Sequence, residues 1–522
     1  MIDKDLILFI HMQAETILFR PKWTCGRFHK ESETAIMYNL STGLSYLFEN
    51  ESSTVISVIL DYKRGSSFKV EDLCSRSHYE LSDLEGFIEV LIDNGLLSLI
   101  ETIEDPFHSN ELANQINKPL VNDSQSIINE TEIVFAKRTN NRVADVVLEL
   151  TYNCSEKCIH CYNPGATRNN DEISFRSNFG TLSFGDYKRI IDELNDLGVV
   201  KVCLTGGDPF SNKDIWGIVS YLYEKEIAFE IFTNGLGLLG KEQRLASLFP
   251  LDIGLTIYST NPDVHDRITR VPGSLKKTLE VLANLHKIGV PLIIKCPLMR
   301  LNFKDYPKVI ALGETYNAEV QIDGRLLDSS DGDECVSNYL RLSEEQLKVV
   351  LMDNRVQFHV GKDLEEFGAL NRNQKDVACL AGMNNICITP DGNVIPCVCF
   401  HSPIGNVQSH SLKEILTNNP MLKKLSEMTY EKYPFCGKEE YCKYCMLCPG
   451  LNFSKHGKIE VPAEDNCYFA KIRHQLVKEI REGKDPLKGI TIEEALSHFE
   501  EDIPNQIHRI INHCYYNHSL II

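Results

Sequence analysis

The chain has 522 residues, more than one ordinary hydrophobic core holds, so several domains are expected. Its 73 acidic and 54 basic residues give a formal net charge of −19, which repels phosphate backbones and argues against nucleic acid as a partner. No apolar run is long enough to span a membrane and no amino-terminal signal segment is found, so we expect a cytoplasmic protein with no membrane partner.

Residues 1–100 combine strand-like and helix-like patterns and are expected to form one small α+β unit. Apolar runs at 6–12, 15–21 and 34–50 predict strands, and later apolar residues at three- and four-residue spacing predict helices within 53–65 and 82–100. The polar segment 101–141 is expected to be a linker with at most one short helix.

Residues 142–330 show alternating strands and helices. Helix-like segments such as 183–198 and 274–289 separate short apolar runs, as in βαβ units with parallel strands. Six repeats are too few for a complete eightfold barrel, so the expected fold class is α/β, with a partial six-stranded parallel barrel or an open sheet. The predicted strands are residues 146–150, 199–204, 228–232, 252–258, 291–298 and 319–322.

The 18 cysteines, without a secretion signal, indicate metal or redox chemistry rather than a disulfide framework. Three lie in "TYNCSEKCIHCYN" (residues 151–163), and nine lie between Cys379 and Cys467, where there is little periodicity and a metal is needed to hold the fold. The remaining six are expected to be small buried apolar residues without a further role: Cys25, Cys74, Cys203, Cys296, Cys335 and Cys514.

The loop with three cysteines directly follows the first predicted strand of the α/β segment, at the sheet edge where parallel folds bind ligands. The spacings between Cys154, Cys158 and Cys161 let one short loop surround a corner of a four-iron cluster, and three thiolates leave one iron open for a substrate or cofactor. The alternative is a zinc site completed by His160 or a distant cysteine, which would be cramped because His160 lies between two of the cysteines.

This loop resembles the CxxxCxxC signature of the radical S-adenosylmethionine (SAM) superfamily, which follows the first strand of such a barrel. The resemblance implies that Cys154, Cys158 and Cys161 hold a [4Fe-4S] cluster and that SAM chelates the open iron. It further implies that the reduced cluster cleaves SAM to a 5′-deoxyadenosyl radical, so that the cofactor carries the chemistry and the protein positions it.

Further motifs at successive strand ends resemble the same family. "TGGDP" (205–209) is similar to the family's GGEP motif, with aspartate in place of glutamate, and its glycines would let the backbone approach the SAM amino group. "TNG" (233–235) and "YST" (258–260) follow the next two strands, and "HDRITRVPGS" (265–274) resembles a segment of the peptide-modifying branch. The resemblance implies SAM-binding roles for Gly206, Gly207, Asp208, Asn234, Ser259 and Arg270.

Two other polar groups also have a structural interpretation. Lys295 and Asn302 resemble a pattern of the peptide-modifying branch, although Lys295 equally fits an inward-facing strand residue with a partner. Asp328, Asp331 and Asp333 are expected to form a solvated acidic loop.

Residues 379–470 resemble the SPASM extension of radical enzymes that act on peptides and proteins. Cys379 is followed by twelve residues, Gly392, four residues and Cys397, as in that extension, whereas the later spacings of five, two and two residues depart from it. Eight cysteines would complete two [4Fe-4S] clusters and leave Cys399 spare; the alternative is one or two ribbon-type zinc sites. The expected ligands are Cys379, Cys387, Cys397, Cys436, Cys442, Cys445, Cys448 and Cys467. Residues 331–378 are expected to bridge the two parts, and residues 471–522 to form a helical tail.

Residues 1–100 resemble the PqqD-like recognition element that precedes many radical maturases. In that element the leader of a precursor peptide adds a strand to an exposed sheet edge, here expected near residues 34–40 ("TAIMYNL"). Fusion of the element to the barrel would raise the effective concentration of the tethered substrate. The alternative is a generic winged-helix-like domain that packs on the barrel.

Together these resemblances imply a radical SAM maturase of a ribosomally synthesised precursor peptide. It would abstract a hydrogen from a core residue and form a new bond, expected to be a thioether to cysteine; carbon–carbon crosslinking, epimerisation or another oxidation would use the same motifs. The expected partners are the precursor peptide and an electron donor such as flavodoxin or ferredoxin. The alternatives are a sulfatase-maturating oxidase and, in another class, a non-catalytic zinc-stabilised peptide-binding protein.

Overall fold

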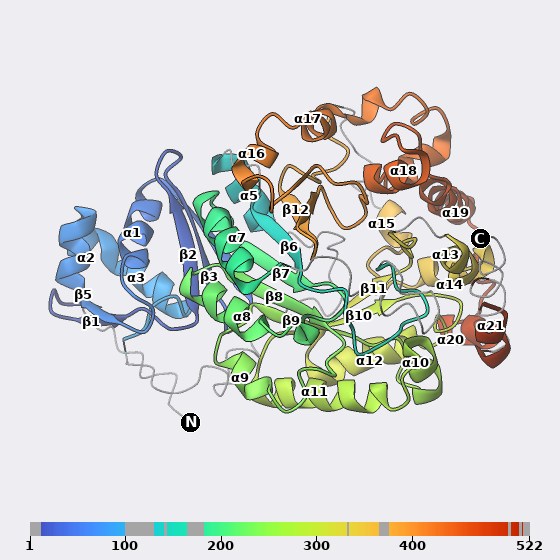
Figure 1. Cartoon of the computed structure of the whole chain (residues 1–522), viewed down its shortest axis with the longest axis horizontal. Helices are drawn as coiled ribbons and strands as arrows, with labels where there is room; N and C mark the ends of the chain where they lie inside the picture. The colour runs from blue at the N-terminus through green and yellow to red at the C-terminus, as the bar shows by residue number, and fades with distance from the viewer. Residues whose placement is uncertain are drawn as a thin grey trace.

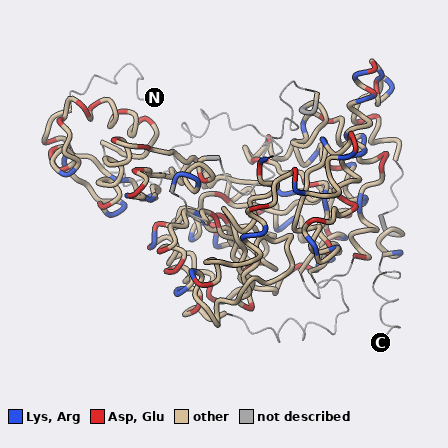
Figure 2. Tube along the Cα trace, turned by 90° about the horizontal axis from the view of Figure 1, so that it is seen from above, with Lys and Arg blue, Asp and Glu red and all other residues tan. Residues whose placement is uncertain are grey.

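The computed structural model describes residues 12–99, 130–139, 143–163, 182–330, 334–364, 375–499, 503–510 and 514. A small amino-terminal unit lies beside a larger body that is built on one long sheet (Figure 1). Acidic and basic residues are interspersed over both parts (Figure 2). Among the described residues, no helix is both long enough and apolar enough to cross a membrane.

The amino-terminal unit contains a three-stranded antiparallel sheet of order β2-β3-β4, a second strand pair β1-β5, and three helices. The strands and helices predicted within 15–21, 34–50, 53–65 and 82–100 are present, whereas β2, β5 and α2 are additional elements. The bounds are β1 (Ile17–Phe19), β2 (Thr24–His29), β3 (Thr34–Asn39), β4 (Leu44–Glu49), α1 (Glu51–Leu60), β5 (Ser67–Lys69), α2 (Val70–Ser77) and α3 (Leu81–Asp93). The predicted strand at 6–12 lies outside the described residues apart from Met12.

Strand β3 is the central strand of its sheet. Thr34 is paired with His29 on one side and with Glu49 on the other, and the whole strand is flanked in this way up to Asn39. A peptide can add a strand only at a sheet edge. The expectation of an exposed edge near residues 34–40 is therefore wrong, because β2 and β4 are the outer strands of this sheet.

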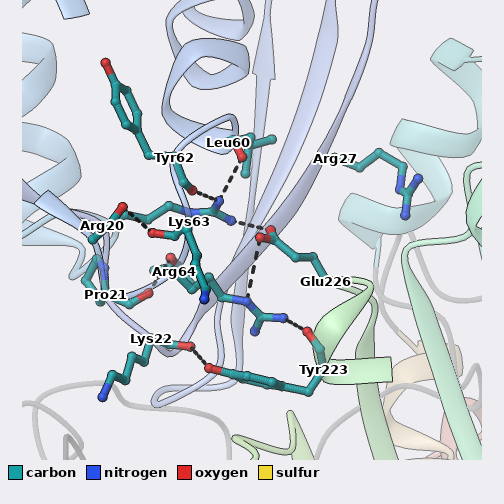
Figure 3. Close-up of polar contacts among 12 residues, drawn as sticks. Arg20, Pro21, Lys22, Arg27, Leu60, Tyr62, Lys63, Arg64, Tyr223 and Glu226 are labelled. Carbon is teal, nitrogen blue, oxygen red and sulfur yellow. Dashed lines mark hydrogen bonds and ion pairs between the residues drawn. The ribbon is translucent and has the colours of Figure 1, made fainter. Parts of the chain in front are cut away.

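A buried arginine joins the amino-terminal unit to the larger body. Arg20 is fully buried; its guanidinium donates to two carbonyls of its own unit and to the Glu226 carboxylate of the larger body. Beside it, Arg64 donates to the Tyr223 carbonyl and lies 4.0 Å above the Tyr223 ring (Figure 3). Since a buried cation without a partner is costly, Glu226 holds the two parts together at this point.

Helix α5 (Glu130–Thr139), within the segment expected to be a linker, makes a second connection. The Tyr38 hydroxyl of β3 donates to Glu132 of α5 over 2.8 Å, and Glu132 is paired with Lys201 of the larger body at 3.3 Å. Lys201 also lies 3.3 Å from Asp145 and 3.7 Å from Glu230. All five residues are buried, so this ionic network lies within the protein and links the small sheet, α5 and the large sheet.

The larger body has a nine-stranded sheet of order β11-β10-β9-β8-β7-β6-β12-β13-β14. Neighbouring strands from β6 to β11 are all parallel, which confirms the predicted α/β class. Each of the six predicted apolar runs forms one of these strands: β6 (Asp145–Glu149), β7 (Lys201–Thr205), β8 (Ala228–Thr233), β9 (Asp252–Thr256), β10 (Leu292–Pro297) and β11 (Glu319–Asp323).

Helices connect the parallel strands and cover the outer face of the sheet (Figure 1). Ser183 caps the first of them: its hydroxyl accepts from the Asp186 amide while the Asp186 carboxylate accepts from the Ser183 amide. The connecting elements are α7 (Phe184–Asp196), η4 (Pro209–Ser211), α8 (Ile215–Glu224), α9 (Glu242–Ala246), α10 (Pro262–Thr269), α11 (Ser274–Ile288) and α12 (Tyr306–Tyr316).

The cysteine-rich segment extends the same sheet. Strand β12 (Asn385–Ile388) lies parallel to β6 and forms an antiparallel hairpin with β13 (Asn393–Ile395), with Gly392 in the turn at φ 81°. The cysteine-rich segment thus contributes strands to the sheet of the parallel region. The other elements are β14 (Gly405–Asn406), α16 (Leu412–Leu416), α17 (Pro420–Glu427), η5 (Tyr430–Lys432), η6 (Glu440–Tyr444), α18 (Pro449–His456) and α19 (Glu464–Arg481).

Short helices complete the larger body on both sides of the cysteine-rich segment, and a disulfide connects two of these regions. Cys335 and Cys514 are bonded to each other, so the expectation that both are unpaired apolar residues is wrong. Sequence reasoning missed the pair because 179 residues separate the two cysteines. The helices are α13 (Cys335–Leu340), α14 (Glu344–Met352), α15 (Gly361–Leu364), α20 (Ile492–Ser497) and α21 (Ile503–Ile510).

Candidate active site

The loop with Cys154, Cys158 and Cys161 lies at the carboxyl end of β6. The Lys157 and Ile159 amides donate to the last carbonyls of α10, over 3.0 and 2.9 Å, and the Ile159 side chain is fully buried. The loop is thus held at its centre by backbone bonds and an apolar anchor, which leaves the cysteines on either side available for ligation.

The cysteine thiols of this loop lie together and already accept hydrogen bonds. The Asn234 amide group donates to Cys154 Sγ over 3.4 Å, and the Tyr258 hydroxyl donates to Cys158 Sγ, also over 3.4 Å. Burial, followed by the neighbouring acidic groups and thiols, raises the pKa of Cys154 to about 12 and that of Cys158 well above its usual range. Thiolates here need a positive counterpart, which the irons of a cluster supply.

One ring nitrogen of His160 is engaged in a hydrogen bond with a tyrosine. Its Nε2 atom lies 2.9 Å from the Tyr258 hydroxyl, and burial lowers its pKa to about 4, so the ring is neutral. A zinc ion bound at Nε2 of His160 would have to break this bond. In the parts of the chain described above, no three His, Cys, Asp or Glu side chains converge as the ligands of a single ion do. The ligands of a four-iron cluster bind separate irons, so the thiols of this loop fit such a cluster.

The glycine pair of "TGGDP" packs against the cysteine loop itself. The Gly207 amide donates to the Thr151 carbonyl over 2.6 Å, and a Cβ on Gly206 would lie 2.5 Å from that same oxygen. Gly206 also has φ 122°, and its carbonyl accepts from the Asn163 side chain over 3.1 Å. The pair therefore allows a close approach between the end of β7 and the cysteine loop, a structural role that was not predicted.

Asp208 and Asn234 connect three neighbouring strand ends. Asp208 is fully buried and accepts from the Thr233 hydroxyl over 2.6 Å and from the Asn234 amide over 3.0 Å. Its own amide donates to the Asn153 carbonyl over 2.9 Å, and burial raises its pKa. The carboxylate thereby fixes Asn234, whose side chain contacts both Cys154 and Ser155. These two predicted site residues do come together at the cysteine loop.

The structure places Ser259 and Arg270 differently. Ser259 is fully buried and its hydroxyl donates to the Asp305 carboxylate over 2.5 Å, so it is engaged within the protein. Arg270 is the half-buried residue at the carboxyl end of α10, at φ 59°, directly after the turn that holds the cysteine loop. Arg270 follows Thr269, whose carbonyl accepts from the loop, and Ser259 follows Tyr258, whose hydroxyl donates to Cys158.

Lys295 and Asn302 each contact other residues of the protein in and beside the parallel sheet. Lys295 Nζ lies 3.4 Å from the Phe232 ring centroid in the sheet, and burial lowers its pKa. Asn302 is buried and donates to the Tyr258 and Pro297 carbonyls, over 2.8 and 3.0 Å. Asn302 thus orients the segment that carries the tyrosine on Cys158.

The expected solvated acidic loop is wrong for Asp328. Its side chain is nearly buried and is paired with Arg341 at 3.2 Å and with Lys455 at 2.8 Å. Because Lys455 belongs to α18, this carboxylate joins the end of the parallel sheet region to the cysteine-rich segment. Asp331 and Asp333 lie outside the described residues.

Sequence reasoning missed two tyrosines of this region. Tyr258 donates to Cys158, and Tyr162 donates to Glu149 of β6 over 3.0 Å. Burial raises the pKa of Glu149 to about 7. The only signal was position: Tyr162 follows the last cysteine of the loop, and Tyr258 opens the "YST" segment whose neighbouring serine was chosen instead.

The cysteines after residue 378 gather in two groups. In the first, the Cys399 thiol hydrogen-bonds with the Cys397 and Cys448 thiols, and burial together with Cys448 raises the pKa of Cys379 to about 11. In the second, burial and the neighbouring Cys442 and Cys467 thiols raise the pKa of Cys436 to about 11. Cys445 adjoins the second group, since its thiol donates a hydrogen bond over 3.7 Å to the carbonyl of Asn466, the residue before Cys467. Cys387 is fully buried in the large sheet with Val147, Cys203 and Ile395, and burial, followed by Glu149 and Cys399, raises its pKa.

Comparison with known families decides between an iron-sulfur enzyme and a non-catalytic zinc-stabilised protein. Residues 148–312 match the Radical SAM superfamily, and residues 379–449 match the SPASM iron-sulfur cluster-binding domain. The protein is a radical SAM enzyme with a SPASM domain. Its cofactors are SAM, the [4Fe-4S] cluster of the radical SAM domain and iron-sulfur cluster binding by the SPASM domain. A non-catalytic zinc-stabilised binding protein is therefore excluded.

This radical SAM enzyme is similar to several characterised proteins. The AdoMet-dependent heme synthase of Methanosarcina barkeri is 24% identical, with 60% of this chain and 93% of the relative covered. AlbA, the subtilosin biosynthesis protein of Bacillus subtilis, is 26% identical over 62% of this chain and 70% of AlbA. The PqqA peptide cyclase of Ruegeria pomeroyi is 26% identical over 48% of this chain and 67% of the cyclase.

Among solved structures, Streptococcus suis SuiB bound to the precursor peptide SuiA has a TM-score of 0.49 with 15% identity. That comparison covers 86% of this radical SAM enzyme and 99% of SuiB.

Proposed function

We propose that this radical SAM enzyme modifies a ribosomally made precursor peptide, whose leader binds the amino-terminal unit. The observation that carries the proposal is the fusion of a radical SAM domain to a small sheet with outer strands, beside a helix that exposes Val90. Relatives named as a bacteriocin biosynthesis protein and as a peptide cyclase agree with a peptide substrate.

The residues of the loop have defined tasks in this proposal. Cys154, Cys158 and Cys161 would hold the SAM cluster, which supplies the reducing electron that lets SAM yield a hydrogen-abstracting radical. Asn234 and Tyr258 keep two of the thiols oriented, and Asp208 holds Asn234 in place. The proposed SAM-binding set remains Gly206, Gly207, Asp208, Asn234, Ser259 and Arg270, of which Ser259 is fully buried with its hydroxyl donating to Asp305.

The proposed leader-binding strand is β4. Strand β2 faces the larger body, because Arg27 donates to the Asn195 carbonyl and side-chain oxygen over 2.9 and 2.8 Å. Strand β4 is the outermost described strand on the opposite side. Its Phe48 ring meets Phe87 of α3 edge-to-face at 5.9 Å, and Val90, one turn further along α3, is 52% exposed. A leader paired along β4 would bury this apolar surface.

The two cysteine groups of the SPASM domain would hold two auxiliary [4Fe-4S] clusters. Closure of a thioether would remove two hydrogen atoms, that is two protons and two electrons, from the peptide. The radical derived from SAM would take one hydrogen atom, the cysteine thiol would release its proton to solvent, and an auxiliary cluster would accept the remaining electron. Such transfer suits clusters with all irons ligated by protein. A flavodoxin or ferredoxin would return electrons to the SAM cluster.

The test uses the reconstituted, reduced full chain with SAM and the peptide encoded by the neighbouring reading frame. We expect release of 5′-deoxyadenosine and a product lighter by two hydrogens, with a fragmentation pattern that locates the crosslink on cysteine. The control is the triple variant C154A/C158A/C161A, which should release none. No mass change with inversion of a residue would show epimerisation, and conversion of a single cysteine or serine to an aldehyde would show the sulfatase-maturating alternative.

Leader binding is tested separately by fluorescence anisotropy with the labelled leader. We expect Val90→Glu to weaken binding about tenfold, which is about 1.4 kcal/mol. The matched control is Ile17→Glu, because Ile17 is 50% exposed but lies on β1 in the other sheet. Equal affinities for the two variants would contradict leader binding beside β4.

A further inference from the structure

The SPASM segment contains one cysteine more than two four-iron clusters need. Nine cysteines lie between Cys379 and Cys467, and eight thiolates complete two such clusters. The spacing of the sequence leaves out Cys399, because Cys379, Cys387 and Cys397 stand first in chain order. The structure favours a different choice.

Cys399 lies within the first cysteine group and is fixed there from two sides. Its thiol hydrogen-bonds with the Cys397 and Cys448 thiols. Its carbonyl accepts from the Ser454 hydroxyl of α18 over 3.1 Å. A Cβ on Gly450 would lie 2.9 Å from that carbonyl oxygen and 3.1 Å from Cys399 Cβ, so Gly450 is the residue that lets α18 approach Cys399 closely.

The residue between these two cysteines points elsewhere. Val398 packs with Cys203 and Ile395 in the small apolar cluster of the large sheet, while Cys397 packs against the separate core around Phe400. The stretch Cys397–Val398–Cys399 forms a turn, in which the Phe400 amide donates to the Cys397 carbonyl over 2.9 Å. The turn directs Val398 to the sheet and leaves the Cys397 and Cys399 thiols in the same group.

Cys387 occupies the sheet rather than the cysteine group. It is the third residue of β12, where it pairs with Val147 of β6 and Ile395 of β13. Its exposed fraction is 0%, and its apolar neighbours are Val147, Cys203 and Ile395. A buried thiol in such surroundings behaves as a small apolar side chain.

We propose that Cys399, and not Cys387, is the fourth thiolate of the first auxiliary cluster, together with Cys379, Cys397 and Cys448. This inference rests on the proposed function in that the SPASM domain holds two clusters. It deepens that function: four protein thiolates leave no open iron at this cluster, so the cluster transfers electrons and does not bind the substrate.

The test measures the auxiliary clusters in the absence of the SAM cluster. In the C154A/C158A/C161A background, anaerobic reconstitution should give about eight irons per chain. Cys399→Ala should lower this to roughly four to seven irons and change the EPR spectrum of the reduced protein, and Cys399→Ser should keep the iron but shift the spectrum. Cys387→Ala should keep both the iron and the spectrum. The matched control is Cys203→Ala, which removes a thiol from the same apolar cluster as Cys387.

Each result separates the inference from the proposed function. Loss of iron or a changed spectrum in Cys387→Ala, with Cys399→Ala unchanged, overturns the inference and restores Cys387 as the ligand. Unchanged spectra for both variants also overturn it, since the first cluster would then have an open iron. A background protein without iron would contradict the auxiliary clusters of the proposed function, whatever Cys399 does. Circular dichroism of each variant shows whether it is folded.

Discussion

At the scale of single residues, polar side chains around the cysteine loop donate hydrogen bonds to the cysteine sulfurs without being cluster ligands themselves. Asn234 donates to Cys154 Sγ over 3.4 Å and is itself oriented by Asp208 and Ser155. A hydrogen bond to a ligand sulfur favours the reduced, more negative state of a cluster. Asn234 is therefore a positioning residue whose effect is electrostatic.

Replacement Asn234→Ala should make the SAM cluster harder to reduce. Loss of about 1 kcal/mol of differential stabilisation corresponds to a potential lower by about 40 mV for one electron. The measurement is a redox titration that follows the EPR signal which changes on addition of SAM. Ser155→Ala is the comparison, because Ser155 helps to orient Asn234 and should therefore give a smaller shift than Asn234→Ala. An equal shift in both variants would argue against the direct bond.

Glu149 makes stability depend on pH. Burial raises its pKa from 4.5 to about 7, and the nearby Asp391 adds to this rise, while the Tyr162 hydrogen bond opposes it. The folded chain keeps the proton up to about pH 7, whereas the unfolded chain releases it near 4.5. Stability contributed by the neutral carboxyl is therefore present at low pH and is lost as the pH rises through this window.

Replacement Glu149→Gln should remove this pH dependence, because a neutral amide of similar shape can still accept the Tyr162 hydroxyl. Relative to the natural chain, the variant should gain up to about 3 kcal/mol in the free energy of unfolding between pH 5 and pH 8. Thermal midpoints at both pH values provide the measurement. A constant difference between the two proteins across this range would show that Glu149 ionises normally.

At the scale of elements, the end of β7 and the cysteine loop form one unit. A Cβ on Gly207 would lie 2.7 Å from both the Asn153 and the Tyr152 carbonyl carbon. These are backbone atoms, so the loop itself must shift if the glycine is replaced. The geometry of the cluster site thus depends on a residue that binds no metal.

Replacement Gly207→Ala should disturb the SAM cluster site while leaving the SPASM domain intact. We expect a loss of up to about four irons per chain and no release of 5′-deoxyadenosine. The control is Gly86→Ala in α3, where nothing lies within 4 Å of the added Cβ and where alanine should stabilise the helix by about 1 kcal/mol. Full iron content in Gly207→Ala would show that the loop accommodates the methyl group.

The same elements show what could be read from the sequence. All six parallel strands were predictable, because strands buried on both faces are continuous apolar runs bounded by turns. Strand β2 was not, since "TCGRFH" contains glycine and polar residues that only its neighbour β3 explains. The addition of β12 to β6 joins residues far apart in the chain, which local patterns do not record.

The site followed the same rule. The three loop cysteines could be predicted from their spacing, and the glycine pair and Asp208 from their short motif. The partners of Ser259 and Cys399 come from distant segments: Asp305 occupies the serine hydroxyl, and Cys448 lies beside Cys399. Spacing alone therefore could not decide between Cys387 and Cys399, and it overlooked the tyrosine on Cys158.

At the scale of the whole molecule, the amino-terminal unit and the larger body are joined by buried charges rather than by a purely apolar contact. Arg20 meets Glu226 at one place, and Tyr38, Glu132 and Lys201 form a chain at another. Buried ion pairs fix one geometry, because misplacement leaves a charge without a partner. This arrangement would hold a leader on β4 at a fixed distance from the cysteine loop.

Replacement Glu226→Gln should loosen this connection, because the fully buried Arg20 guanidinium loses its carboxylate while its two carbonyl partners remain. We expect a loss of about 2 kcal/mol in the stability of the interface, less than for a fully buried pair because the Glu226 side chain is 27% exposed. The matched control is Glu224→Gln, an exposed carboxylate at the last residue of α8, two positions before Glu226. Hydrogen exchange is the measurement. Amides of β2 and of the Tyr223–Glu226 turn should exchange faster in Glu226→Gln and not in Glu224→Gln. Equal protection in both variants would show that apolar packing holds the two parts together.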